Sequence, residues 1–122
     1  MIKRLDTLEI AATNLDELSA LYQHNFGFQV DRGEKAGEAI IAIGDARIRF
    51  RSGAGVEAAL KTSGEGLAAL WLEADDVDQV AAALNGAGIP HRAIRREDDR
   101  RILEVDAKAA NLVPLFIFDR RP

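Results

Sequence analysis

The fold is decided by one pattern that occurs twice, as LDTLEIAATNLDELSALYQHNFGFQV at residues 5–30 and as ALWLEADDVDQVAAALNGAGIPHR at residues 69–92. In each copy, apolar and polar side chains alternate, and a cap residue, a helical apolar stripe and a glycine follow. Alternation of period two predicts a strand with one buried face, and apolar residues three or four apart predict an amphipathic helix. The chain therefore carries an internal duplication with a period of about 60 residues.

The helix boundaries repeat between the two copies. Asn14 precedes the first helix with Glu17 three residues later, and Asp76 and Gln79 repeat this spacing in the second copy. This is the spacing of a capping box, in which the cap side chain accepts a hydrogen bond from a backbone N–H of the first turn. A glycine follows each helix, Gly27 in the first copy, so we expect the first helix over residues 15–25.

The remaining segments predict more strands and a connection between the copies. Strands are expected at residues 28–31, at 38–52 around a turn at Gly44 and Asp45, at 89–94, at 100–107 and at 112–119. The glycine-rich stretch 53–66 predicts a linker or a short helix. The sequence thus predicts a single α+β domain over residues 1–122, made of two βαβββ modules at about 1–52 and 67–119. Each module would have a curved mixed sheet with one helix outside, and the two sheets would enclose a cleft.

Composition excludes several classes of protein. With 122 residues the chain is long enough for one core, and its net charge of −4 argues against a nucleic-acid partner. It contains no cysteine, so disulfides and thiol chemistry are excluded. No apolar run is long enough for a membrane span, and the N-terminus lacks the apolar core of a signal peptide. We therefore expect a cytoplasmic protein without a nucleic-acid or membrane partner.

The two repeated segments resemble the vicinal oxygen chelate superfamily, which includes glyoxalase I, the bleomycin resistance proteins, methylmalonyl-CoA epimerase and the extradiol dioxygenases. The resemblance covers essentially the whole chain and implies the paired βαβββ fold. It also implies a homodimer, since small members of this superfamily commonly form one. It does not imply a single activity, because the fold hosts isomerases, lyases, dioxygenases, transferases and binding proteins.

The resemblance also locates the positions at which such enzymes hold a divalent metal, usually through His, Gln or Glu. The corresponding positions here lie on the first and last strands of each module: Thr7, Arg49, Ala69 and Phe116. None of the four is a suitable metal ligand, and the charge of Arg49 would repel a cation. We therefore expect no catalytic metal and no cofactor.

Strand alternation predicts which side chains would line the cleft. If Leu8 and Ile10 face the helix, their neighbours face the cleft, and the same holds in the second copy. For the last strand the two faces are equally apolar, so the choice between them is open. The candidate ligand-binding residues are Thr7, Glu9, Arg49, Ala69, Trp71, Glu73 and Phe116.

These candidates allow two interpretations. Trp71 could stack on a flat ligand while Arg49 offers a planar pair of donors to a carboxylate or phosphate. Alternatively, Trp71 and Phe116 fill a collapsed cleft or a dimer seam, and Arg49 belongs to a solvated strand face together with Arg47 and Arg51.

Glu9 and Glu73 occupy equivalent places in the two repeats and are candidate general acid/base residues. The alternative is that arginines hold them ionised, with Arg49 as a candidate partner. His24 and His91 are expected at the surface, and the charged run RREDDRR at residues 95–101 is expected to form a solvated hairpin tip.

Three functional hypotheses follow. The first is a metal-independent protein that binds a small, aromatic or amphipathic ligand without changing it. The second is a lyase, isomerase or dioxygenase that uses Glu9 or Glu73, or a metal held by residues in another register. The third is an interaction module with a collapsed cleft. We favour the first, because the expected metal positions lack ligands while Trp71 and flanking charges remain.

Overall fold

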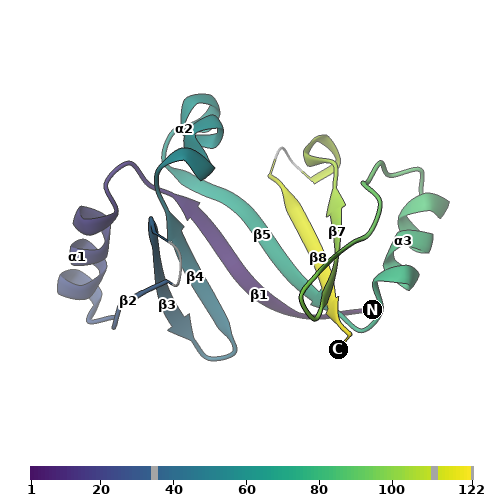
Figure 1. The fold of residues 1–122 in the computed structure, drawn as a ribbon, viewed down its shortest axis with the longest axis horizontal. Coiled ribbons are helices and arrows are strands. Elements are labelled where there is room, and N and C mark those ends of the chain that lie inside the picture. The colour runs from purple at the N-terminus through teal and green to yellow at the C-terminus, as the bar shows by residue number, and fades with distance from the viewer. Residues whose placement is uncertain (34–35, 111–112, 122) are drawn as a thin grey trace. The chain divides into compact units, whose positions relative to one another are not determined.

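The computed structural model describes residues 1–33, 36–110 and 113–121. The chain divides into two compact units, each described by itself below. The first-repeat unit comprises residues 7–68, and the second-repeat unit comprises residues 1–6 together with residues 69 onward. Two strands, β1 (Ile2–Ala11) and β5 (Gly66–Ala74), contribute residues to both units (Figure 1).

The first-repeat unit has the predicted βαβββ order. After β1 come α1 (Leu15–Phe26), β2 (Asp31–Arg32), β3 (Glu38–Ile43) and β4 (Ala46–Arg51). The strand order is β2-β3-β4-β1, with β1 parallel to β4 and the β3–β4 hairpin antiparallel. The sheet is therefore mixed, as expected, and the hairpin turns at Gly44 and Asp45 as predicted.

The core of the first-repeat unit lies between α1 and its sheet. Leu15 at the start of α1 is buried with Ile41 and Phe50, and Ile10 and Ile48 pack against this cluster. The alternation therefore predicted the helix-facing side of β1 and β4 correctly, because apolar side chains of one strand face are buried together.

The two predicted cap residues lie at the two ends of α1. The Asn14 side-chain oxygen accepts a hydrogen bond from the backbone N–H of Glu17 at 3.0 Å, which is one half of the predicted capping box. Gly27 ends the helix with φ of 70°, in the left-handed region that residues with a Cβ adopt only at a cost.

The segment between the repeats is a short helix rather than a bare linker. It contains a 3₁₀ turn at Ala54–Val56 followed by α2 (Glu57–Ser63). After α2, the Glu65 carboxylate accepts hydrogen bonds from the hydroxyl and the backbone N–H of Thr13, at 2.6 and 2.8 Å. These bonds lower the pKa of Glu65 and fix the end of this segment beside the β1–α1 loop.

The second-repeat unit repeats the βαβββ order. After β5 come α3 (Val77–Gly86), β6 (Arg95–Glu97), β7 (Arg100–Val105), a 3₁₀ turn at Ala107–Ala110, and β8 (Leu115–Arg120). The strand order is β1-β5-β8-β7-β6, with β5 parallel to β8 and β7 antiparallel to both of its neighbours. Both repeats therefore have the predicted α+β architecture of a mixed sheet and one packed helix.

The core of this unit decides which face of the last strand packs under the helix. Val77 and Val80 of α3 are buried with Leu103 and Ile117, and Leu115 packs against the same cluster. Since Leu115 and Ile117 face α3, Phe116 and Phe118 lie on the opposite sheet face. None of the described helices has the length and apolar character needed to cross a membrane.

Two strands lie later in the chain than predicted. The strand expected at 89–94 is instead β6, at Arg95–Glu97, and within 89–94 only His91 forms an isolated bridge, with Val105. Ile89 and Ile94 pack into the core, so their apolar character reflects burial and not strand pairing. Pro90 also lacks the N–H that a ladder requires.

The same shift occurs in the first repeat, where the strand expected at 28–31 is β2 at Asp31–Arg32. Phe28 and Val30 pack against the core instead of pairing. The last predicted strand, 112–119, begins at Leu112, which lies outside the described residues; β8 begins at Leu115.

Candidate functional site

In the first-repeat unit, the sheet face away from α1 is a layer of paired charges. Glu9 is only 6% exposed and receives Arg49 Nη1 at 3.0 Å and Arg51 Nη1 at 3.5 Å. Arg49 Nε also lies 3.6 Å from a carboxylate oxygen of Glu38. The predicted pairing of Arg49 with Glu9 is confirmed, and it follows from the strand register, in which these two residues are direct neighbours.

Thr7 lies on the same face and is fully buried. Its register neighbour is Arg47, whose Nε donates to the Thr7 hydroxyl at 3.3 Å. A cation placed at Thr7 would meet a guanidinium, which repels it. The corresponding residue of the other unit, Ala69, is also buried and has no side-chain donor atom.

These residues do not fit a divalent metal. Protein sites for such cations are built mainly from carboxylate, imidazole or thiolate ligands, and Thr7 and Ala69 carry none of these groups. Within residues 1–33, 36–110 and 113–121, no group of three or more His, Asp or Glu side chains could hold such an ion.

In the second-repeat unit, the sheet face away from α3 carries an aromatic stack. The rings of Trp71 and Phe116, which are register neighbours on β5 and β8, are 4.3 Å apart and nearly parallel at 13°. Phe118 meets Trp71 edge-on at 6.3 Å. One face of the Trp71 ring is therefore covered by Phe116 of its own chain.

Three arginines lie over this stack. Arg100 is 5.3 Å from the ring centres of both Trp71 and Phe118, Arg95 is 5.9 Å from Phe116, and Arg120 is 5.4 Å from Phe118. Guanidinium groups at such distances are attracted by the negative faces of aromatic rings. The face is thus an alternating layer of arginines and aromatic rings.

Glu73 lies on the same strand as Trp71 and is held by cations. It is 6% exposed, and Arg4 donates to it through Nε at 2.9 Å and Nη2 at 2.8 Å. Lys3 and Arg120 lie 3.9 Å away. Burial would lower the pKa of Arg4, but the charges and hydrogen bonds of Asp6 and Glu73 outweigh it and raise this pKa.

One carboxylate oxygen of Glu9 and one of Glu73, Oε1 in both residues, are therefore held by arginines of their own units. The sequence predicted this outcome as the alternative to acid/base catalysis. A substrate proton would have to compete with these guanidinium donors for a carboxylate oxygen.

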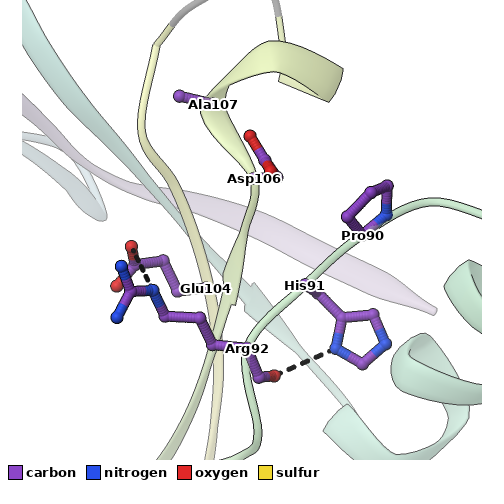
Figure 2. Close-up of a pocket in the computed structure, with 6 residues that line it drawn as sticks. All are labelled: Pro90, His91, Arg92, Glu104, Asp106 and Ala107. Carbon is purple, nitrogen blue, oxygen red and sulfur yellow. Dashed lines mark hydrogen bonds and ion pairs between the residues drawn. The ribbon is translucent and has the colours of Figure 1, made fainter.

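His91 lines a polar cavity of about 330 Å³ in the second-repeat unit (Figure 2). Its ring nitrogens lie 3.0 Å from the backbone oxygen of Arg92 and 2.9 Å from the side-chain oxygen of Asn85. Arg92 also pairs with Glu104 at 3.3 Å. The sequence predicted His91 at the surface but gave no sign of this cavity, because its wall forms where the 89–94 segment lies beside β7.

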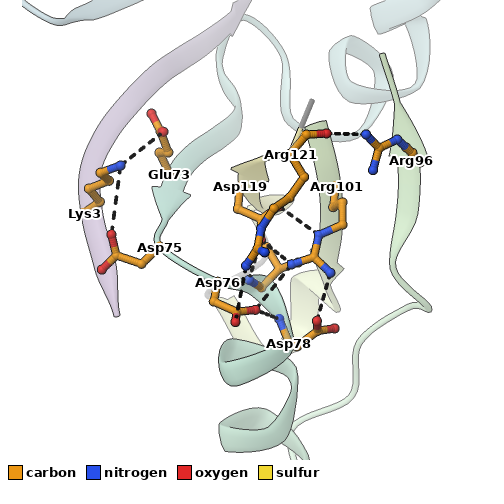
Figure 3. A network of polar contacts seen from close by, with 10 residues as sticks. Lys3, Glu73, Asp75, Asp76, Asp78, Arg96, Arg101, Asp119 and Arg121 are labelled. Atoms are coloured by element: carbon orange, nitrogen blue, oxygen red, sulfur yellow. Dashed lines mark hydrogen bonds and ion pairs between the residues drawn. The ribbon is translucent and has the colours of Figure 1, made fainter. Parts of the chain in front are cut away.

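A second polar network anchors the N-terminus of α3 (Figure 3). Asp119 of β8 is 1% exposed and accepts the backbone N–H of Val77 at 3.0 Å and Arg101 Nε at 3.0 Å. Arg101 also reaches Asp78 at 2.8 Å and Asp76 at 3.3 Å.

The prediction of a solvated hairpin tip at residues 95–101 holds for residues 95–99, which are exposed at the β6–β7 hairpin, but it does not hold for Arg101. Arg101 is tied to a buried carboxylate, and its hydrogen bonds to Asp119 and Asp78 raise its pKa. Burial acts to raise the pKa of Asp119, but the hydrogen bonds from Arg101 and Val77 prevail and lower it. The network fixes α3 on the sheet and is structural.

Comparison with known proteins places the chain in a family. The model of the Glyoxalase/Bleomycin resistance protein/Dioxygenase superfamily matches residues 4–101. The chain belongs to this superfamily. The resemblance to the vicinal oxygen chelate superfamily is thereby confirmed, and the match includes both repeated segments, 5–30 and 69–92.

Solved structures of this superfamily share the fold at low sequence identity. Methylmalonyl-CoA epimerase from Mycobacterium tuberculosis is 22% identical with a TM-score of 0.75, and the alignment covers 99% of this chain and 90% of that one. A Streptomyces coelicolor methylmalonyl-CoA epimerase variant in complex with 2-nitronate-propionyl-CoA is 23% identical, with a TM-score of 0.75 and coverage of 98% and 96%.

A hypothetical protein from Bacillus halodurans is 14% identical, with a TM-score of 0.78 and coverage of 98% and 95%. No curated protein matches the chain significantly. At these identities the neighbours establish the fold of this superfamily member, while its substrate has to be argued from its own residues.

Proposed function

We propose that this superfamily member binds a small aromatic or amphipathic molecule without a catalytic metal. The observation that carries the proposal is the Trp71–Phe116 stack, whose indole N–H is buried and has no hydrogen-bond acceptor among the described residues. A buried donor without an acceptor is costly, and a ligand oxygen would relieve that cost.

Metal independence is supported by the side chains at the superfamily's metal positions. Thr7 has a guanidinium neighbour and Ala69 lacks a donor atom, while Glu9 and Glu73 each lie beside arginines whose positive charge opposes a cation. Of the predicted ligand residues, Trp71, Phe116 and Glu73 share one sheet face of the second-repeat unit. Thr7, Glu9 and Arg49 share the corresponding face of the first-repeat unit.

The first measurement is native mass spectrometry of freshly purified protein. We expect a metal-free mass, and an organic adduct would identify the ligand class. The spectrum also reports the number of subunits, for which we propose two. A retained divalent metal would contradict the proposal.

Binding is tested by calorimetric titration with two probes of matched shape, 1-naphthoate and the neutral 1-naphthamide. Trp71→Ala should weaken binding by about 1–3 kcal/mol, because an aromatic contact and its buried area are lost. Phe26→Ala is the matched control, since Phe26 is an aromatic residue of α1 that is 64% exposed. If neither probe binds the folded protein at millimolar concentration, the proposal fails.

The second candidate is an isomerase, favoured by the solved neighbours named as methylmalonyl-CoA epimerases. In this case Glu9 or Glu73 would remove a proton from the substrate after displacing an arginine. Incubation with methylmalonyl-CoA in D₂O distinguishes the two candidates. Deuterium incorporation that Glu73→Gln or Glu9→Gln abolishes, with folding intact, would establish the enzyme and displace the binding proposal.

A further inference from the structure

We infer that the ligand of the second-repeat unit is an anion, a planar carboxylate or similar oxyanion, and that Arg100 binds its charged group. This inference rests on the proposed function and adds the chemical class of the ligand and the residue that selects it.

Arg100 differs from the other two arginines of the layer. Arg95 lies 3.6 Å from Glu97 and 3.5 Å from Glu104, and Arg120 lies 3.7 Å from Asp99 and 3.9 Å from Glu73. Arg100 has no ion pair and no side-chain hydrogen bond to any of the residues that the structure describes. Its charge is therefore not paired with a side-chain carboxylate among the described residues of its unit.

The aromatic rings position Arg100 without using its donors. Its guanidinium lies 5.3 Å from the centres of both Trp71 and Phe118, so two ring faces restrict where the group can lie. Ring contacts of this kind leave the N–H groups of the guanidinium available for hydrogen bonds. An arginine held in place with free donors suits a planar oxyanion, which it can bind through two parallel hydrogen bonds.

The indole of Trp71 adds a second donor to the same layer. Its Nε1 is buried and has no acceptor among the described residues. Arg100 cannot satisfy it, because a guanidinium has donors and no acceptor. Two donor groups that share one aromatic stack and lack acceptors are complementary to an acceptor-only group, and an ionised carboxylate is such a group.

The titration described above tests the inference through the difference between its two probes. The wild-type protein should bind 1-naphthoate roughly tenfold or more tightly than 1-naphthamide, because a hydrogen bond to a charged group is stronger than one to a neutral amide. The preference should shrink as salt is added, since salt screens partly exposed charges.

Arg100→Gln should remove this preference and leave naphthamide binding nearly unchanged. Arg96→Gln is the control for loss of one positive charge in the same unit, because Arg96 is exposed, alternates with Arg95 along β6 and donates to the backbone oxygen of Arg121. It should keep the preference. Circular dichroism verifies that each variant is folded, and the salt dependence of the wild type tests the inference even if Arg100→Gln does not fold.

Each outcome has a definite meaning. Equal binding of both probes to the wild type, or a preference that survives in folded Arg100→Gln, overturns the anion inference and leaves the proposed function standing. If neither probe binds, the proposed function is rejected, and the anion inference is rejected with it.

Discussion

At the scale of single residues, Asp119 carries the greatest consequence for stability. It is buried at the N-terminus of α3 and holds Arg101 and the backbone N–H of Val77. Removing the Asp119 carboxylate leaves the Val77 N–H without its acceptor, while Arg101 keeps Asp76 and Asp78 as partners. We expect Asp119→Ala to lower the free energy of unfolding by about 1–3 kcal/mol, measured by urea denaturation.

The effect of Asp119 should depend on pH with a definite sign. Its pKa in the folded protein is lowered, so the unfolded chain takes up the proton first as the pH falls. The stabilisation by the ionised Asp119 carboxylate is complete above the pKa of this group in the unfolded chain, about 3.9. It is lost as the pH falls through the lower pKa of the folded protein. The difference in stability between wild type and Asp119→Asn should be constant from pH 8 to pH 5 and narrow below about pH 4. A difference that grows on acidification would contradict this account.

At the scale of elements, helices α1 and α3 end in different ways, and the glycines at their ends provide a matched pair of substitutions. Gly27 caps α1 with φ of 70°, whereas Gly86 is the last residue of α3, has an ordinary φ and has open space where a Cβ would lie. We expect Gly27→Ala to destabilise the protein by about 1 kcal/mol and Gly86→Ala to stabilise it by about 0.5–1 kcal/mol. Thermal denaturation of the two variants measures both changes, and shifts of the same sign would refute the cap assignment.

Local patterns predicted the elements well where one residue type determines the structure. Asn14 and Gly27 fix the ends of α1 through their own backbone and side-chain geometry, so the sequence was sufficient there. The second helix was different, because Asp76 caps Asp78 and not Gln79, and Asp119 of a distant strand binds Val77. A contact between residues 42 positions apart has no signal in a local pattern.

The same limit applies to the candidate site. Alternation placed Glu9, Arg49 and Trp71 on the sheet faces away from the helices, since that follows from a period of two. It did not indicate that Arg100 would lie over Trp71, because this contact depends on how β7 and β8 pair. The cavity beside His91 was missed for the same reason, as it depends on where the 89–94 segment packs.

At the scale of the whole molecule, the boundary between the units does not coincide with the boundary between the repeats. Residues 1–6 belong to the second-repeat unit, where the Asp75 backbone N–H donates to the Met1 carbonyl and Arg4 binds Glu73. Deleting residues 2–5 should therefore affect β5 more than β3 and β4. We expect hydrogen exchange of β5 amides to accelerate roughly tenfold, equivalent to about 1.4 kcal/mol.

Amides of β3 and β4 should keep their protection in this deletion, because their hairpin and α1 lie in the first-repeat unit. Mass spectrometry of peptides after exchange compares the two regions directly. Equal acceleration in both would show that the N-terminal residues support the chain as a whole.

The packing of Trp71 on Phe116 also provides an intrinsic spectroscopic probe of folding. The chain contains one tryptophan and one tyrosine, and Trp71 lies in the second-repeat unit while Tyr22 lies in the first. Tyr22 packs at 5.0 Å from Phe50, as Trp71 packs on Phe116, so both chromophores sit in asymmetric surroundings that melting would abolish. Near-ultraviolet circular dichroism can therefore follow each half of the duplication through its own band, without any label, and coincident melting of the two bands would be the signature of cooperative unfolding.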